Sequence, residues 1–148
     1  MASYKYRVDC GYYTTYAKVD VRPNYRRFHS MCAQESFDIL RDTNDDTRIF
    51  KAWSFVSYDT PICRVWYDSK WNVWYYTVNA EYFNHSNSTI HQFSRWLNEH
   101  TSFISYMSIK KLSQQPMSGT PDISTISYAK NVHVSFCSDD KIRDLFNW

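Results

Sequence analysis

Three runs of β-branched and aromatic residues occupy the middle of the chain and constrain its fold more than any other feature. The runs are 49–57 (IFKAWSFVS), 61–67 (PICRVWY) and 72–78 (NVWYYTV), and the short segments 58–60 and 68–70 separate them. Residues of these types favour the extended backbone of strands, and connections this short join neighbouring antiparallel strands. The sequence therefore predicts an antiparallel meander.

Side chains in the first of these runs are apolar in both alternating sets. Trp53 and Phe55 fall in one set, whereas Phe50 and Val56 fall in the other. A strand with apolar residues on both faces is typical of a position covered on both sides. We expect the first run to be a central strand.

Further strands are predicted on either side of the meander. Tyr, Val and Thr residues are frequent from 4 to 21, with a break at Cys10–Gly11, which is the pattern of a hairpin. Residues 131–137 alternate like a strand. The segment 24–40 fits no single period and is interpreted as a strand or irregular structure, and the polar residues 42–47 predict a loop.

The hydrophobic period changes from two to about 3.6 after Ser88. This predicts a helix over 88–99, with Asn87 or Ser88 as its N-cap, because a short oxygen-bearing side chain can accept a hydrogen bond from an unpaired backbone N–H. Ser138 is the predicted N-cap of a second, C-terminal helix. Residues 102–112 are compatible with a strand or a short helix.

The buried face of the C-terminal helix is predicted to comprise Ile142, Leu145 and Phe146. Between this helix and the first one, residues 113–122 contain Pro116, Gly119 and Pro121 and predict a loop.

These elements indicate an α+β domain: an antiparallel β-sheet of about five to seven strands with two helices packed on it. A chain of 148 residues has the size of one domain, 1–148. No apolar run approaches the roughly 20 residues that cross a bilayer, and the N-terminus lacks the apolar core of a secretory signal. We therefore expect no membrane association and a cytoplasmic location in the cell that makes the protein.

The composition argues against several classes of function. Aromatic residues make up 19% of the chain, but there are only two glycines, Gly11 and Gly119, so a glycine-rich phosphate-binding loop cannot be built. The net charge of +2 is too small for strong non-specific binding of nucleic acid and has the wrong sign for an acidic DNA mimic. The four cysteines are far apart, which predicts buried thiols and neither a zinc nor a redox motif. No cofactor is predicted.

Three of the five histidines lie within sixteen residues, at His85, His91 and His100. Their spacings of six and nine do not match the i, i+4 pair that places two ligands on one helical face, so no metal site is predicted. His91 could act as a base or ligand in the first turn of the helix, or it could be a solvated residue next to Arg95. The proximity of a cation favours the second interpretation.

Two tetrapeptides, His100-Thr-Ser-Phe and His133-Val-Ser-Phe, are similar to the short element that two-histidine phosphoesterases use twice. The similarity implies an enzyme acting on cyclic nucleotides, with His as acid and base and the hydroxyl positioning the phosphate. The two elements are 33 residues apart, which is short for strands on opposite halves of such a fold.

Nucleic-acid binding is an alternative function. Arg22, Arg26 and Arg27 cluster with Tyr25 and Phe28, and basic residues beside aromatic ones can hold a backbone and stack bases. Acidic residues follow this cluster closely, and its aromatic residues can equally be strand residues.

The middle of the chain carries a motif in two parts. The first part, S-Y-x-T-x-I, lies at residues 57–62, and the second, a Tyr-containing turn followed by T-x-x-H-Q, is matched in part by Tyr82, Ser88-Thr89 and His91-Gln92. Together they resemble a small domain of unknown function that is associated with bacteriophages and mobile elements. The motif covers about a third of the chain. The resemblance implies a phage origin and no assigned chemistry.

The resemblance favours a small phage-encoded protein of an anti-CRISPR-like type that antagonises host defence by binding, without catalysis. Its expected partner is a host protein such as a defence nuclease complex, and it would act as a monomer or homodimer. Aromatic side chains dominate the binding energy at many interfaces. The predicted contact residues are Trp66, Trp71, Trp74, Tyr75, Arg26, Arg27 and His91.

Overall fold

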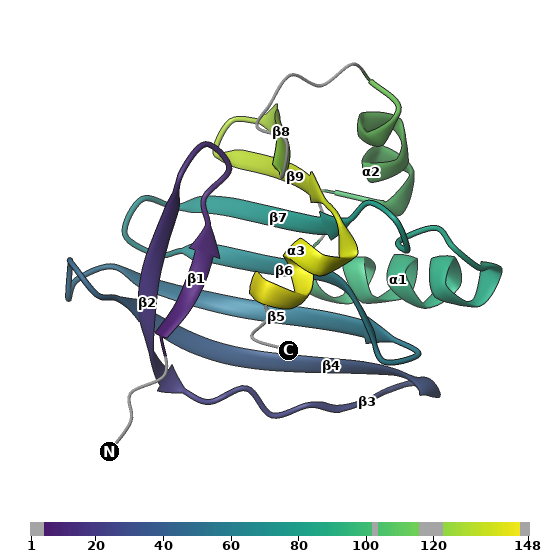
Figure 1. The fold of residues 1–148 in the computed structure, drawn as a ribbon, viewed down its shortest axis with the longest axis horizontal. Helices are drawn as coiled ribbons and strands as arrows, with labels where there is room; N and C mark the ends of the chain where they lie inside the picture. Colours follow the sequence, from purple (N-terminus) through teal and green to yellow (C-terminus); the bar gives the residue numbers. More distant parts are fainter. Residues whose placement is uncertain (1–4, 102–103, 116–122, 146–148) are drawn as a thin grey trace.

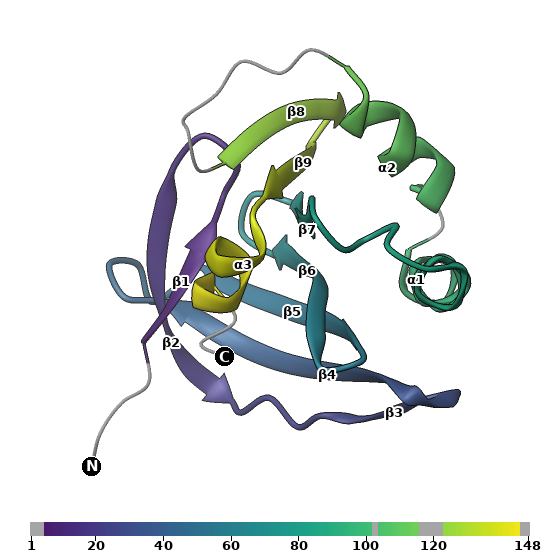
Figure 2. The same ribbon diagram turned by 45° about the vertical axis from the view of Figure 1, so that its right-hand side comes forward.

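A single curled β-sheet forms the body of the protein. The computed structural model describes residues 5–101, 104–115 and 123–145. Its sheet has nine strands in the order β1-β2-β4-β5-β6-β7-β9-β8, with β3 paired to β4, and it curves into a half-barrel (Figures 1 and 2). The elements are β1 (Lys5–Asp9), β2 (Thr14–Val21), β3 (Arg26–Phe28), β4 (Ser30–Asp42), β5 (Ile49–Ser57), β6 (Thr60–Asp68), β7 (Val73–Asn79), α1 (Asn87–His100), α2 (Tyr106–Ser113), β8 (Ile123–Ala129), β9 (Val132–Cys137) and α3 (Asp139–Leu145).

The prediction of an α+β fold with an antiparallel sheet of about five to seven strands and two helices was wrong. The protein is mostly β, with nine strands and three short helices in its described parts. The sheet is mixed, because β9 returns parallel to β7 after the chain has formed α1, α2 and β8. Local sequence patterns reveal strands but carry no information on which distant strand becomes a neighbour.

The meander and the hairpin predicted from the sequence are confirmed. The three central runs form β5, β6 and β7, which pair antiparallel in consecutive order, and β1 pairs antiparallel with β2 as the predicted hairpin. Tyr58 and Asp59 form a two-residue turn with φ of 51° and 61°, the left-handed conformation that such hairpins require. Most of the segment 24–40, whose sequence fits no single period, belongs to β4, which at 13 residues is the longest strand in the described chain.

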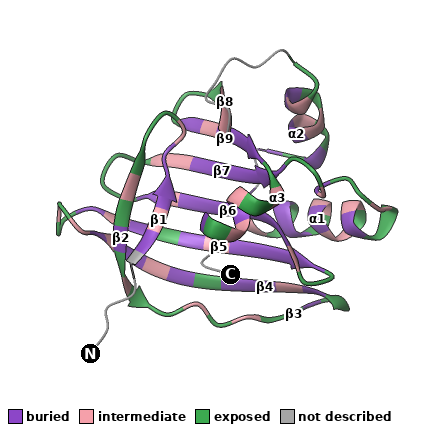
Figure 3. Cartoon of the chain, in the orientation of Figure 1, coloured by how far each residue is buried: buried purple, intermediate pink, exposed green. Residues whose placement is uncertain are grey.

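Two apolar cores lie on opposite faces of the sheet. On the outer face, α1 and α2 cover one half of the strands, with Phe55 and Trp96 among the buried side chains. On the inner face, the curled β1–β2 hairpin and α3 enclose a second core that includes Leu40, Trp66 and Ile142. The central strands therefore contain runs of consecutive buried residues (Figure 3), as expected for strands that are covered on both faces and as predicted for β5.

The helix starts agree with the sequence except at one cap. The N-cap of α1 is Ser86, not Asn87 or Ser88, and its Oγ accepts a hydrogen bond from the backbone N–H of Thr89 at 3.1 Å. Ser138 precedes α3, and its hydroxyl accepts from the N–H of Lys141. The ambiguous residues 102–112 contribute a helix, α2.

Several smaller expectations have mixed outcomes. Ile142 and Leu145 are buried as predicted, whereas Phe146 and most of the loop 113–122 lie outside the described residues. Three cysteines are buried thiols, but Cys32 is exposed, contrary to the prediction. In the parts of the chain that the structure describes, no helix has the length and apolar character to span a membrane.

Candidate binding surface

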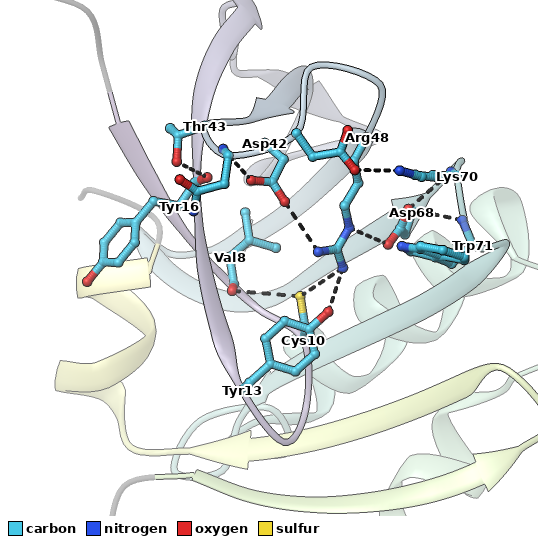
Figure 4. A network of polar contacts seen from close by, with 12 residues as sticks. Val8, Cys10, Tyr13, Tyr16, Asp42, Thr43, Arg48, Asp68, Lys70 and Trp71 are labelled. Carbon is cyan, nitrogen blue, oxygen red and sulfur yellow. Dashed lines mark hydrogen bonds and ion pairs between the residues drawn. The ribbon is translucent and has the colours of Figure 1, made fainter.

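A buried arginine joins three loops at the end of the sheet where the β1–β2 hairpin folds over (Figure 4). Arg48 donates from Nε to Asp68 Oδ2 at 2.7 Å and from a terminal nitrogen to Asp42 Oδ2 at 3.3 Å. Its other terminal nitrogen donates to the hydroxyl of Tyr13 at 2.7 Å. One cation therefore faces two nearly inaccessible carboxylates and a phenol.

The protonation states within this network follow from its geometry. Burial by itself would lower the pKa of Arg48, but its hydrogen bonds to Tyr13 and Asp68 outweigh this effect and raise the pKa. Burial raises the pKa of the Cys10 thiol to about 12 and also raises the pKa of Tyr13. Arg48 therefore stays charged, while the thiol and the phenol stay neutral.

The same network fixes the β6–β7 turn. Asp68 uses its second oxygen, Oδ1, to accept from the backbone N–H groups of Lys70 and Trp71 at 3.1 and 3.3 Å. Lys70 in turn reaches Asp45 in the β4–β5 loop with its Nζ. The hairpin, the β4–β5 loop and the β6–β7 turn are thus held in one arrangement by ionic hydrogen bonds.

Three aromatic side chains project into solvent from the loops that Arg48 connects. Tyr12, Tyr13 and Trp71 have exposed fractions of 70%, 52% and 60%, and we name them the aromatic edge. The Nζ of Lys70 lies 5.2 Å from the centre of the Trp71 ring, which is a cation–π distance. The edge is therefore an exposed set of large aromatic rings on loops that hydrogen bonds to Arg48 and Asp68 hold in place.

A second buried ion pair lies deeper in the inner core. Arg64 contacts Asp38 at 2.7 Å, and both side chains are at most 1% exposed. The guanidinium lies 5.6 Å from the ring centre of Tyr6 and 5.4 Å from that of Trp66. Its complete enclosure makes this pair part of the interior and not part of a binding surface.

Of the four aromatic residues predicted for the contact surface, only Trp71 is exposed. Trp66 and Tyr75 point into the inner core and are 0% and 5% exposed, and Trp74 is half-buried on the outer face. Strand alternation explains this separation, because consecutive residues of β7 face opposite sides. Tyr12 and Tyr13 were missed, although two tyrosines directly after the Gly11 turn could have indicated them.

The basic residues in the prediction are at the surface. Arg26, Arg27 and His91 are all exposed. The aromatic neighbours of the arginines are less accessible, because Phe28 is buried in the outer core and Tyr25 is half-buried. The exposed charges of this cluster are therefore not accompanied by exposed rings from Tyr25 and Phe28.

His100 and His133, the pair suggested by the similarity to phosphoesterases, lie on opposite faces of the sheet. His100 ends α1 and pairs through Nε2 with Glu35 Oε1 at 2.8 Å on the outer face, near Trp53. His133 stacks on Tyr75 on the inner face, with ring centres 5.9 Å apart. The structure does not bring these two imidazoles together.

The two parts of the central motif do come together. Residues of both parts line a hollow of about 440 Å³ between the β5–β6 turn and the start of α1, with His85 and Ser86 beside them: Ser57, Tyr58, Thr60, Ile62, Tyr82, Ser88 and Thr89. Ser57 and Thr89 share a hydrogen bond of 2.9 Å between their hydroxyls, and the hydroxyl of Tyr58 donates to Ser88 at 3.2 Å. These pairs hold the hairpin turn to the helix, which gives most of the motif a structural role.

No group of three or more His, Cys, Asp or Glu side chains suited to a metal ion occurs among the residues described. No family model matches the chain, and comparisons with curated proteins and with solved structures gave no match either.

Proposed function

We propose that this protein binds a host protein through its aromatic edge, without catalysis, as a phage-encoded antagonist of host defence of the anti-CRISPR type. The observation that carries the proposal is the exposure of Tyr12, Tyr13 and Trp71 on loops that Arg48 ties together. The phage origin comes from the resemblance of the central motif.

Large aromatic rings on a rigid support are well suited to protein recognition. Tyr and Trp are enriched among the residues whose truncation costs about 2 kcal/mol or more of binding energy. Ordering a loop on binding costs free energy, and loops already fixed by the Arg48 network avoid much of that cost. Buried ion pairs seldom add net stability, so a role in fixing these loops is a reason to retain this one.

The test is recovery of a partner from lysates of candidate bacterial hosts, including strains with defence nucleases. We expect the immobilised protein to retain one partner in stoichiometric amount. The double variant Tyr12→Ser/Trp71→Ser should lose that partner, because it removes two of the three rings of the aromatic edge. It should still fold, since both side chains are exposed and contribute little to folding. Met107→Ser is a matched control, since Met107 is 55% exposed on α2, on the outer face.

Two results would contradict the proposal. The first is retention of the partner by the double variant at wild-type affinity. The second is recovery of nucleic acid alone, released by moderate salt, because counterion-dependent binding is the property of a phosphate-binding surface.

A further inference from the structure

A row of aromatic rings crosses the half of the outer sheet face that α1 and α2 leave uncovered. Phe37 of β4, Trp53 of β5, Trp74 of β7 and Tyr67 of β6 form this aromatic row. Their ring centres are 5.3 Å apart for Phe37–Trp53, 5.7 Å for Trp53–Trp74 and 4.7 Å for Trp74–Tyr67. Phe37 is 39% exposed and the other three are half-buried, so each ring lies at the surface of the sheet.

The aromatic row has a hollow at each end. One, of about 400 Å³, is lined by Phe37 and Trp53 together with Arg26 and His100. The other, of about 530 Å³, is lined by Trp74, Tyr128 of β8 and Lys130. Rings that form the walls of hollows leave space for a flat group to stack against them.

The charges beside the row are mainly positive. Lys51 is exposed and lies in register opposite Tyr67, within the row itself. Lys130 and Arg26 stand in the two hollows. Glu35 is the one carboxylate that lines either hollow in the described chain, and it already pairs with Arg26 Nε at 3.1 Å and with His100.

We propose that the aromatic row binds single-stranded nucleic acid, with bases stacked on Trp53, Trp74 and Phe37 and phosphates near Lys51, Lys130 and Arg26. Stacking needs unpaired bases, whose faces a duplex conceals. Neighbouring strands are about 4.8 Å apart, so the distance from β4 to β8, five strand spacings, is roughly 24 Å. This length suits about four nucleotides, the lower end of the site sizes of single-strand-binding folds. The site goes beyond the proposed protein-binding function and uses different residues.

The probes are fluorescein-labelled ten-nucleotide oligothymidine and oligouridine, titrated with the protein at about 50 mM salt. We expect both to bind and to quench tryptophan fluorescence, with affinity falling as salt rises. The Phe37→Ser and Trp53→Leu variants should each weaken binding by about 5- to 150-fold, the range measured for loss of one stacked base. A DNA duplex of ten A·T pairs should bind far more weakly than either single strand.

Charge and location are tested by separate variants. Lys51→Glu should weaken binding and reduce its dependence on salt, and because Lys51 is exposed this variant should fold. Trp71→Ser, in the aromatic edge, should bind both oligonucleotides like the wild type. Preference for one oligonucleotide would identify the site as selective for RNA or DNA.

The proposal is overturned if neither oligonucleotide binds, if the duplex binds as tightly, or if folded Phe37→Ser and Lys51→Glu proteins bind normally. It is also overturned if these two variants lose a protein partner instead, because the sheet face would then be a protein interface. Failure of the nucleic-acid proposal would not affect the proposal that the aromatic edge binds a protein, since the variant that tests the edge, Tyr12→Ser/Trp71→Ser, alters none of the residues in the row.

Discussion

Arg48 illustrates how a single residue organises the surface around it. It is buried with Asp42 and Asp68, and removing the cation would leave two carboxylates without compensation in a medium that solvates them poorly. The neutral Tyr13 hydroxyl would also lose its donor. The aromatic edge therefore depends on a residue that has almost no contact with solvent.

We predict that Arg48→Met lowers the free energy of unfolding by about 3–5 kcal/mol, the usual cost of breaking a buried ion pair from one side. The double variant Arg48→Met/Asp68→Asn should recover part of this loss, because the amide is uncharged and its oxygen can still accept from Lys70 and Trp71. Urea unfolding of both variants measures the difference. Equal stabilities of single and double variants would show that the Asp68 charge does not matter.

Asp9 is another buried carboxylate, and its effect on stability depends on pH. Burial raises its pKa above the usual value of 3.8, although the N–H of Gly11 and the hydroxyl of Thr77 donate to it. The folded protein thus holds this proton more tightly than the unfolded chain does. Stability is therefore lost as pH rises from about 4 through the raised pKa.

Asp9→Asn should consequently raise the melting temperature at pH 7, by about 2–4 °C for each kcal/mol of stability gained. The amide can accept from Gly11 and donate to Thr77, so its hydrogen bonds are kept. Thermal unfolding followed by circular dichroism should show the advantage shrinking as pH is lowered from 7 towards 4. A variant less stable than the wild type at pH 7 contradicts this account of Asp9.

Among the elements, α1 begins at a defined N-cap residue, Ser86. Ser86→Ala removes the acceptor for the Thr89 N–H and should cost about 1 kcal/mol of stability, a typical value for an N-cap. Ser88→Ala is the matched control, because Ser88 is exposed and its hydroxyl accepts from the Tyr58 hydroxyl, which is also exposed; we expect a change within about 0.5 kcal/mol. Urea unfolding should separate the two, and the reverse order of stabilities would identify Ser88 as the true cap.

Elements with a strong local signal could be predicted from the sequence. The runs that became β5, β6 and β7 are dense in β-branched and aromatic residues, and α1 has a clear helical stripe. β8 was missed because ISTISYA is half polar and lies at the edge of the sheet, where its side chains are half-buried or exposed. β4 was ambiguous because it alternates between an outer face with Phe37 and an inner face with buried Asp38.

At the scale of the whole molecule, the arrangement of strands determines which side chains form a surface. The curl of the sheet brings Tyr13 to Arg48 and Asp68, which are 35 and 55 positions later in the chain. Such pairings depend on topology, which local sequence patterns do not reveal. Trp71 could be predicted as a contact residue because it lies in a turn, whereas the Arg48 network beneath it could not be predicted. The aromatic row likewise exists only because four strands place one ring each on the same face.

The central claim, that the aromatic edge binds a host protein, is tested most directly by hydrogen exchange of the protein alone and in complex with the recovered partner. The account predicts that binding slows amide exchange in residues 10–16 and 68–73, which carry the edge, and leaves α1 and α2 unchanged. Slowed exchange confined to α1 and α2, with no change in the hairpin and the β6–β7 turn, would contradict it.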